Sequence, residues 1–129
     1  MIYVALVTLL ILVQYIIFII QTGMARGKGE VQAPAVTGDE NYERWSRVQT
    51  NTIEQLVILL PAMWICAQFF RADVAAILGL AFLIGRFIYA AAYVKEPKSR
   101  GLGFIIGFLA NVILVLCGLY AVISGLLWL

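Results

Sequence analysis

Two long stretches of the sequence, residues 1–25 and 101–129, carry no charged side chain. Each is longer than the roughly 20 apolar residues that a helix needs to cross the hydrocarbon core of a bilayer. Two further apolar runs, at about 45–70 and 74–94, are separated by the short polar break Arg71-Ala72-Asp73. The sequence therefore predicts an all-α integral membrane protein, a four-helix bundle that forms a single membrane domain over residues 1–129.

The expected helices cover about residues 2–22, 41–70, 74–94 and 102–127. Glycines at 23, 27 and 29 predict the end of the first helix, and the only long loop follows at about 23–40. Asp39 and Asn41 are residues that begin helices, so the second helix should start before its apolar run. No basic residue precedes the first apolar run, which favours a retained helix over a removable signal peptide.

Basic residues favour one orientation of the bundle. Those in or beside the first loop are Arg26, Lys28, Arg44 and Arg47, and those in the third loop are Lys95, Lys98 and Arg100. The second loop has Arg71 alone. By the positive-inside rule, loops one and three face the cytoplasm. The compact chain, without a eukaryotic retention signal, is expected in a bacterial inner membrane. A net charge of +2 is too small to suggest a nucleic-acid partner.

No metal site is expected. The chain has no histidine, and its two cysteines, Cys66 and Cys117, lie deep in apolar runs without CxxC spacing. A free cysteine in such a position usually packs as a small hydrophobic residue.

The second predicted helix carries an unusual stripe of polar residues. Arg44, Arg47, Asn51 and Glu54 recur at spacings of three and four, which places them on one helical face. A charge at mid-bilayer costs about 2.5 to 3.5 kcal/mol on the insertion scale, and such residues usually face the bundle interior and serve a function.

A second stripe on the third helix, formed by Arg86, Tyr89 and Tyr93, points to the same end. A guanidinium group donates hydrogen bonds to a carboxylate, and a tyrosine hydroxyl donates to an anion. Carboxylate and amide oxygens accept hydrogen bonds from an ammonium group. The two stripes and Arg100 predict a site for a zwitterionic small molecule. Alternatively, Arg47 and Glu54 neutralise each other, Asn51 joins two helices, and the tyrosines anchor the membrane interface.

Two segments resemble one family. Residues 43–54, Glu-Arg-Trp-Ser-Arg-Val-Gln-Thr-Asn-Thr-Ile-Glu, are similar to the pattern E-R-x-x-R-x-Q-x-N-x-x-E of the membrane-associated proteins in eicosanoid and glutathione metabolism, the MAPEG family. Residues 85–93, followed by Arg100, are similar to its R-x-x-Y-x-x-x-Y pattern and later arginine. Gln55 departs from members that have tyrosine there, and the lack of histidine weakens the likeness to the prostaglandin-forming branch.

The resemblance implies a homotrimer that binds glutathione, as co-substrate and without a metal, between neighbouring subunits near the cytoplasmic face. It implies that Arg47, Asn51 and Glu54 hold the charged ends of glutathione. The other implied contacts are Gln49, Tyr89, Tyr93 and Arg26. Arg100 corresponds to the arginine that is credited in this family with stabilising the glutathione thiolate, and is the expected catalytic residue.

The implied activity is that of a glutathione transferase, which joins the thiolate to a lipophilic electrophile, with reduction of a hydroperoxide as a further activity. A thiol of pKa about 8.5 is mostly protonated at neutral pH, so a nearby guanidinium favours the reactive anion. Two other classes stay open: a small proton-coupled multidrug exporter that uses Glu54, and a membrane scaffold that binds glutathione without turnover.

Overall fold

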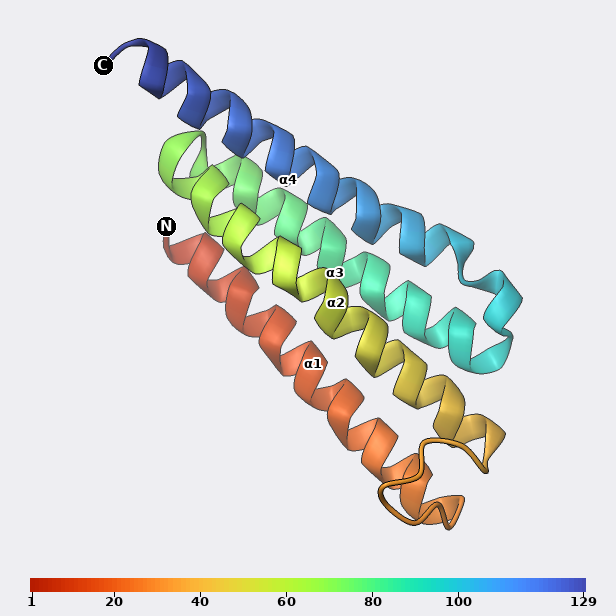
Figure 1. The fold of residues 1–129 in the computed structure, drawn as a ribbon. Helices are drawn as coiled ribbons and strands as arrows, with labels where there is room; N and C mark the ends of the chain where they lie inside the picture. Colours follow the sequence, from red (N-terminus) through yellow and green to blue (C-terminus); the bar gives the residue numbers. More distant parts are fainter.

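The computed structural model describes all residues from 1 to 129 and consists of helices alone (Figure 1). The elements are α1 (Ile2–Lys28), α2 (Glu40–Phe69), α3 (Ala72–Lys95), the short 3₁₀ helix η1 (Pro97–Ser99) and α4 (Gly101–Leu127). The four long helices lie side by side, and consecutive ones run in opposite directions. All four are long and apolar enough to cross a membrane. The predicted all-α architecture of four membrane-capable helices is confirmed.

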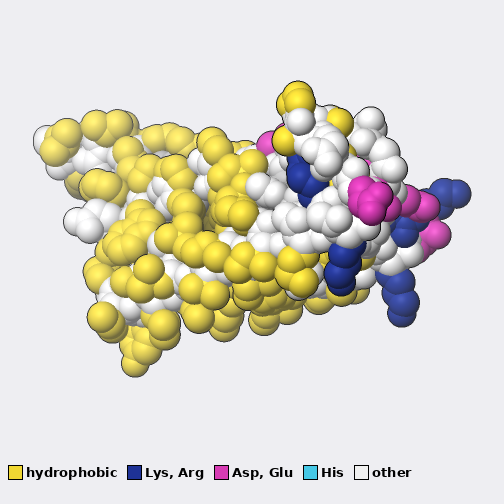
Figure 2. Space-filling model, turned by 90° about the horizontal axis from the view of Figure 1, so that it is seen from below, with side chains coloured by type: hydrophobic (Ala, Val, Ile, Leu, Met, Phe, Trp, Pro, Cys, Tyr) yellow, Lys and Arg dark blue, Asp and Glu magenta, His cyan; other side chains and the backbone are white.

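The two ends of the bundle differ in composition. The loop of residues 29–39 and η1 lie at one end, which we call the polar end, and both chain termini lie at the other (Figure 1). Charged side chains gather at one end of the face seen in Figure 2, and hydrophobic side chains cover the rest. The sides of the bundle therefore suit lipid, and the polar end suits water and headgroups.

The first helix is longer than predicted. The expected end was residue 22, but α1 continues to Lys28, and the long loop shrinks accordingly. Glycine lowers helix stability by only about 1 kcal/mol relative to alanine, which neighbouring contacts can offset. Here Arg26 donates to the carbonyl oxygen of Ala35 at 2.8 Å, and Lys28 adds a second positive charge to the last turn. The positive charges of Arg26 and Lys28 interact favourably with the negative end of the helix dipole.

The second helix begins where a capping residue allows. Asp39 Oδ2 accepts a hydrogen bond from the backbone N–H of Tyr42 at 2.9 Å, which satisfies a first-turn donor. Pro61 lies inside α2 without ending it. The bounds of α2, α3 and α4 differ from the expected ones by one or two residues at most. Helix ends defined by polar breaks are thus well predicted, and an end defined by glycines alone is not.

Close contact between α3 and α4 shapes the polar end. A Cβ added at Gly103 would lie 2.6 Å from the Tyr89 Cα and 2.8 Å from the Gly85 carbonyl oxygen. A Cβ at Gly85 would lie 3.1 Å from the backbone nitrogen of Gly107. Because only glycine leaves room for such an approach, the two helices touch backbone to backbone beside Tyr89.

Candidate functional site

A cavity of about 580 Å³ opens at the polar end between α2, α3 and the start of α4. Its lining consists of Arg47, Asn51, Tyr89, Tyr93, Arg100, Gly101, Phe104 and Ile105. We call it the polar pocket. It brings together predicted site residues from three separate parts of the sequence, and its volume is in the usual range for small-molecule sites.

The α2 wall of the polar pocket has groups that the chain leaves largely unused. Arg47 Nη1 lies 3.8 Å from Glu54 Oε1, and the two side chains are 54% and 56% exposed. An exposed ion pair at this distance contributes little stability. Asn51 Oδ1 is buried without a hydrogen-bond partner. The predicted mutual neutralisation of Arg47 and Glu54 is thus present in a weak form, which leaves most guanidinium donors free.

Two stacked tyrosines form the α3 wall. The ring centroids of Tyr89 and Tyr93 are 5.6 Å apart with an interplanar angle of 23°, and Tyr89 is almost fully buried. Residues four apart lie on the same helical face, so the spacing in the sequence produces this stack directly. The wall presents a flat aromatic surface beside the polar groups of α2.

Arg100 reaches the polar pocket from the connection between α3 and α4. The backbone N–H of Arg100 donates a hydrogen bond to the Pro97 carbonyl oxygen, which closes the turn of η1. Arg100 Nη1 donates to the same oxygen at 3.1 Å. The side chain is exposed. Phe104 and Ile105, also in the lining, were not predicted as site residues. Their spacing of four and five residues from Arg100 was the available signal, because it places them one helical turn further on.

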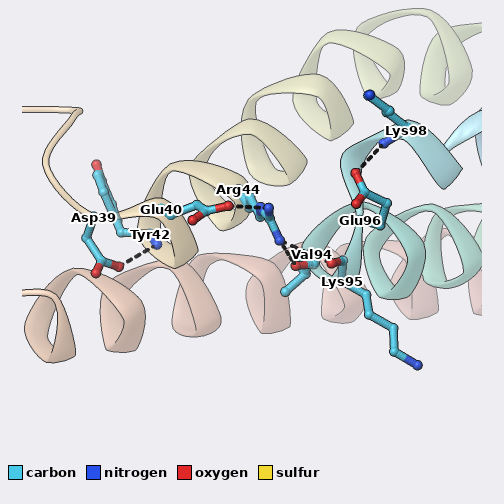
Figure 3. A network of polar contacts seen from close by, with 8 residues as sticks. All are labelled: Asp39, Glu40, Tyr42, Arg44, Val94, Lys95, Glu96 and Lys98. Atoms are coloured by element: carbon cyan, nitrogen blue, oxygen red, sulfur yellow. Dashed lines mark hydrogen bonds and ion pairs between the residues drawn. The ribbon is translucent and has the colours of Figure 1, made fainter.

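Arg44, the first member of the predicted α2 stripe, has a different role. Its Nη1 donates to the carbonyl oxygens of Val94 at 2.9 Å and Lys95 at 3.1 Å, and its Nη2 pairs with Glu40 (Figure 3). The last carbonyls of a helix lack partners within the helix. Arg44 therefore caps the end of α3 and ties it to α2, and it does not line the polar pocket.

Arg26 also lies outside the polar pocket. Its guanidinium carbon is 4.5 Å from the centroid of the Tyr42 ring, it hydrogen-bonds the Tyr42 hydroxyl, and it donates to the carbonyl oxygen of Ala35. It lines a separate hollow of about 660 Å³, formed by the end of α1 and the following loop. Within one chain, the predicted glutathione contact of Arg26 is not joined to the others.

Gln49 and Glu54 complete the predicted set. Gln49 is half-buried and absent from the lining of the polar pocket, since two residues along a helix rotate a side chain by about 200° from Arg47. Glu54 is also absent from the lining but contacts Arg47 at its rim. One chain thus assembles Arg47, Asn51, Tyr89, Tyr93 and Arg100, with Glu54 adjacent and with Arg26 and Gln49 turned elsewhere.

Comparison with known proteins agrees with the resemblance seen in the sequence. The model of the MAPEG family matches residues 4–120. An uncharacterised protein from Synechocystis sp. is 42% identical over 119 residues, which cover 92% of this chain and 87% of the relative. Human microsomal glutathione S-transferase 2 is 33% identical over 123 residues, covering 95% and 84%, and bovine leukotriene C4 synthase is 33% identical over 94 residues, covering 73% and 63%. This integral, multi-pass membrane protein belongs to the MAPEG family.

Proposed function

We propose that the protein is a membrane-bound glutathione transferase that conjugates the glutathione thiolate to a lipophilic electrophile. The observation that carries the proposal is the polar pocket at the polar end of the bundle, which Arg47, Asn51 and Arg100 line together with two stacked tyrosines. The names of the human and bovine relatives describe a glutathione transferase and a leukotriene synthase.

The proposed roles follow from the charge of each group. Glutathione carries two carboxylates and one ammonium group, and Arg47 would bind a carboxylate through its free donors. Asn51 Oδ1, which lacks a partner in the chain, and Glu54 would accept from the ammonium group. Tyr89 and Tyr93 would cover the peptide backbone. Arg100 would lie beside the sulfur and stabilise its negative charge.

The proposed reaction begins when the thiol loses its proton to water at the open end of the polar pocket. The Arg100 guanidinium stabilises the sulfur anion, and each unit by which the thiol pKa falls corresponds to about 1.36 kcal/mol. The sulfur lone pair then forms a carbon–sulfur bond with the electrophile. The displaced group departs with its electron pair. Where the electrophile is an epoxide, the ring C–O bond breaks instead, and the oxygen keeps the electron pair and takes a proton from water.

The lipophilic substrate has an apolar route from the bilayer. A groove of about 450 Å³ lies between α2 and α4, and its lining is almost entirely hydrophobic, including Val57, Pro61 and Leu119. A smaller hollow of about 240 Å³, lined in part by Phe108, shares Ile58 and Val115 with it. Phe108 stacks on Phe104 of the polar pocket at 5.9 Å between centroids. The groove and the hollow thus extend apolar surface from the side of the bundle to a neighbour of the polar pocket, and the lipophilic substrate would approach along it.

We further propose a homotrimer with glutathione shared between subunits. Arg26 and Gln49 lie outside the polar pocket of their own chain, and in the proposed trimer they would contact glutathione held in the polar pocket of a neighbouring subunit. Wide exposed apolar surfaces on the helices are compatible with either lipid or protein contact. Loops one and three would face the cytoplasm of a bacterial inner membrane, where glutathione is supplied from water.

One contact speaks against the exporter hypothesis. A carboxylate that carries protons across the membrane should lie near the midplane, free of a permanent cation. Glu54 is instead 3.8 Å from Arg47, beside the polar pocket. This arrangement favours a bound zwitterion over proton exchange.

The test uses the purified full-length protein with glutathione and an aryl halide electrophile. Conjugate formation is followed by absorbance, and native mass spectrometry reports bound glutathione and the number of subunits. Conjugation with glutathione bound supports the transferase. Binding without conjugation of any electrophile tested would replace it with the scaffold hypothesis, and a lack of both binding and conjugation would refute the proposal.

A further inference from the structure

Arg86 is a fully buried arginine on α3 that neither the polar pocket nor the proposed reaction uses. Its relative exposure is 0%. Nη2 donates to Thr52 Oγ1 of α2 at 2.8 Å, and the guanidinium carbon lies 4.0 Å from the centroid of the Tyr89 ring. Tyr89 lines the polar pocket. Arg86 therefore stands directly behind a wall of the candidate site.

The charge of Arg86 has no counter-charge in the chain. The ion pairs in the structure join Arg44 to Glu40, Arg47 to Glu54, and Arg71 to Asp73. Arg86 Nε and Nη1 are buried without hydrogen-bond partners. A buried and unpaired cation is among the most unfavourable groups that a membrane helix can carry.

A purely structural role explains this arrangement poorly. Replacing a buried ion pair with apolar residues is often neutral or stabilising, and a buried cation with no anionic partner is less favourable than such a pair. The single hydrogen bond to Thr52 is also fixed in direction. Thr52 Oγ1 donates its own hydrogen to the Val48 carbonyl oxygen at 2.7 Å, so its lone pairs face Arg86. The chain holds the guanidinium in one place without neutralising it.

We propose that Arg86 is a positioning residue for the sulfur anion. It holds the Tyr89 ring by cation–π contact and adds an unneutralised positive charge behind the pocket wall. This inference rests on the proposed glutathione transferase function. When the thiol proton leaves to water, the sulfur keeps the electron pair, and the field of Arg86 favours that charge without touching the sulfur.

The size of the effect follows from distance. By Coulomb's law, a unit charge about 12 Å away changes an ionisation equilibrium by about tenfold at an effective dielectric constant of about 20. Arg100 and Arg47 act from the pocket surface, where water screens them more strongly. Arg86 is shielded from water on all sides, so its contribution should persist at high salt.

The test compares Arg86→Met, which keeps length and removes charge, with Arg86→Lys, which keeps charge. Full-length variants are titrated with glutathione and with S-methylglutathione, whose sulfur cannot ionise. Ultraviolet difference absorbance reports the bound thiolate. We expect Arg86→Met to weaken glutathione binding about tenfold more than S-methylglutathione binding and to reduce the thiolate signal. Arg86→Lys should restore most of both.

If the affinities for glutathione and S-methylglutathione fall by the same factor, or if neither changes, the inference is overturned, because Arg86 then has only a packing role. If Arg86→Met does not fold, Arg86→Gln provides the same reading, because it removes the charge and keeps an N–H donor for Thr52 Oγ1. An unchanged ligand ratio in that variant also overturns the inference. Wild-type protein that fails to bind glutathione refutes the proposed function instead, so the two failures are distinguishable.

Discussion

Two pairs of arginines at the polar end use their side chains in opposite ways. Arg26 and Arg44 donate to carbonyl oxygens of the backbone and to a neighbouring side chain, and they build the local structure. Arg47 has only a distant carboxylate, and Arg100 only the carbonyl of its own turn. A guanidinium has five N–H donors, so the second pair keeps most of its donors for a ligand.

Within one chain, the number of hydrogen-bond partners, more than charge or position, separates Arg44, which holds the fold, from Arg47, which lines the polar pocket. Arg44 and Arg47 are three residues apart on one helix, yet only Arg47 lines the polar pocket. Substitutions of Arg44 should alter stability before binding, and substitutions of the second pair should do the reverse.

The largest effect is expected from Arg100→Ala. Removing a group that stabilises developing negative charge commonly lowers turnover by about a hundredfold or more. We expect kcat for conjugation to fall by about that factor while glutathione affinity, measured by calorimetry, falls only a few-fold. Arg71→Ala, at the opposite end of the bundle, is the matched control. Undiminished turnover in Arg100→Ala would remove its catalytic role.

A smaller effect is expected from Arg47→Ala. Hydrogen bonds to charged groups contribute about 1.5 to 3 kcal/mol, so the Kd for glutathione should rise by about ten- to a hundredfold. The thermal midpoint should hardly move, because the pair with Glu54 is exposed and long. Loss of stability without loss of affinity would place Arg47 in the same class as Arg44. Arg47→Lys should recover part of the affinity, since it lacks the planar fork.

Arg44→Ala should mainly destabilise the fold. It removes two hydrogen bonds to the end of α3, which we expect to lower the free energy of unfolding by about 1.5 kcal/mol. Thermal unfolding followed by circular dichroism in detergent measures the change. Residual glutathione affinity per folded molecule should stay within a few-fold of wild type. A selective loss of affinity at unchanged stability would break the comparison between the two pairs.

The smallest effect is expected from Asp39→Ala, which removes the cap of α2 but no arginine contact. Loss of a helix N-cap costs about 1 kcal/mol, and the same unfolding measurement should report a decrease of this size. Asp39→Asn keeps a side-chain acceptor and serves as control, with stability near that of wild type. A decrease in both variants would show that the charge of Asp39, and not its hydrogen bond, stabilises the helix.

Much of the candidate site could be predicted from spacing. Arg47 and Asn51 are one turn apart on α2, Tyr89 and Tyr93 are one turn apart on α3, and regular helices keep such pairs on a common face. The short α3–α4 connection then leaves Arg100 little freedom. Periodicity thus explains why distant segments of the sequence line the same cavity.

What spacing could not predict depends on the groups that face each residue across the bundle. Arg44 shares the face of Arg47, but the uncapped end of α3 lies opposite it and takes its donors. Arg86 was predicted as part of a stripe, and only the packing of three helices shows that it lies behind the wall. Gln49 entered the prediction through family resemblance alone, and its spacing from Arg47 already opposed a shared face.

The backbone contact at Gly103 has a consequence for engineering the protein. Any side chain there would displace the backbone of Tyr89, so the place of Tyr89 beside the polar pocket is set by main-chain geometry that no rotamer change can adjust. Libraries that vary Phe104 and Ile105 would therefore alter the shape of the polar pocket beside these two residues and leave the position of Tyr89 unchanged. Selection for new electrophiles has a permissive position directly beside a forbidden one.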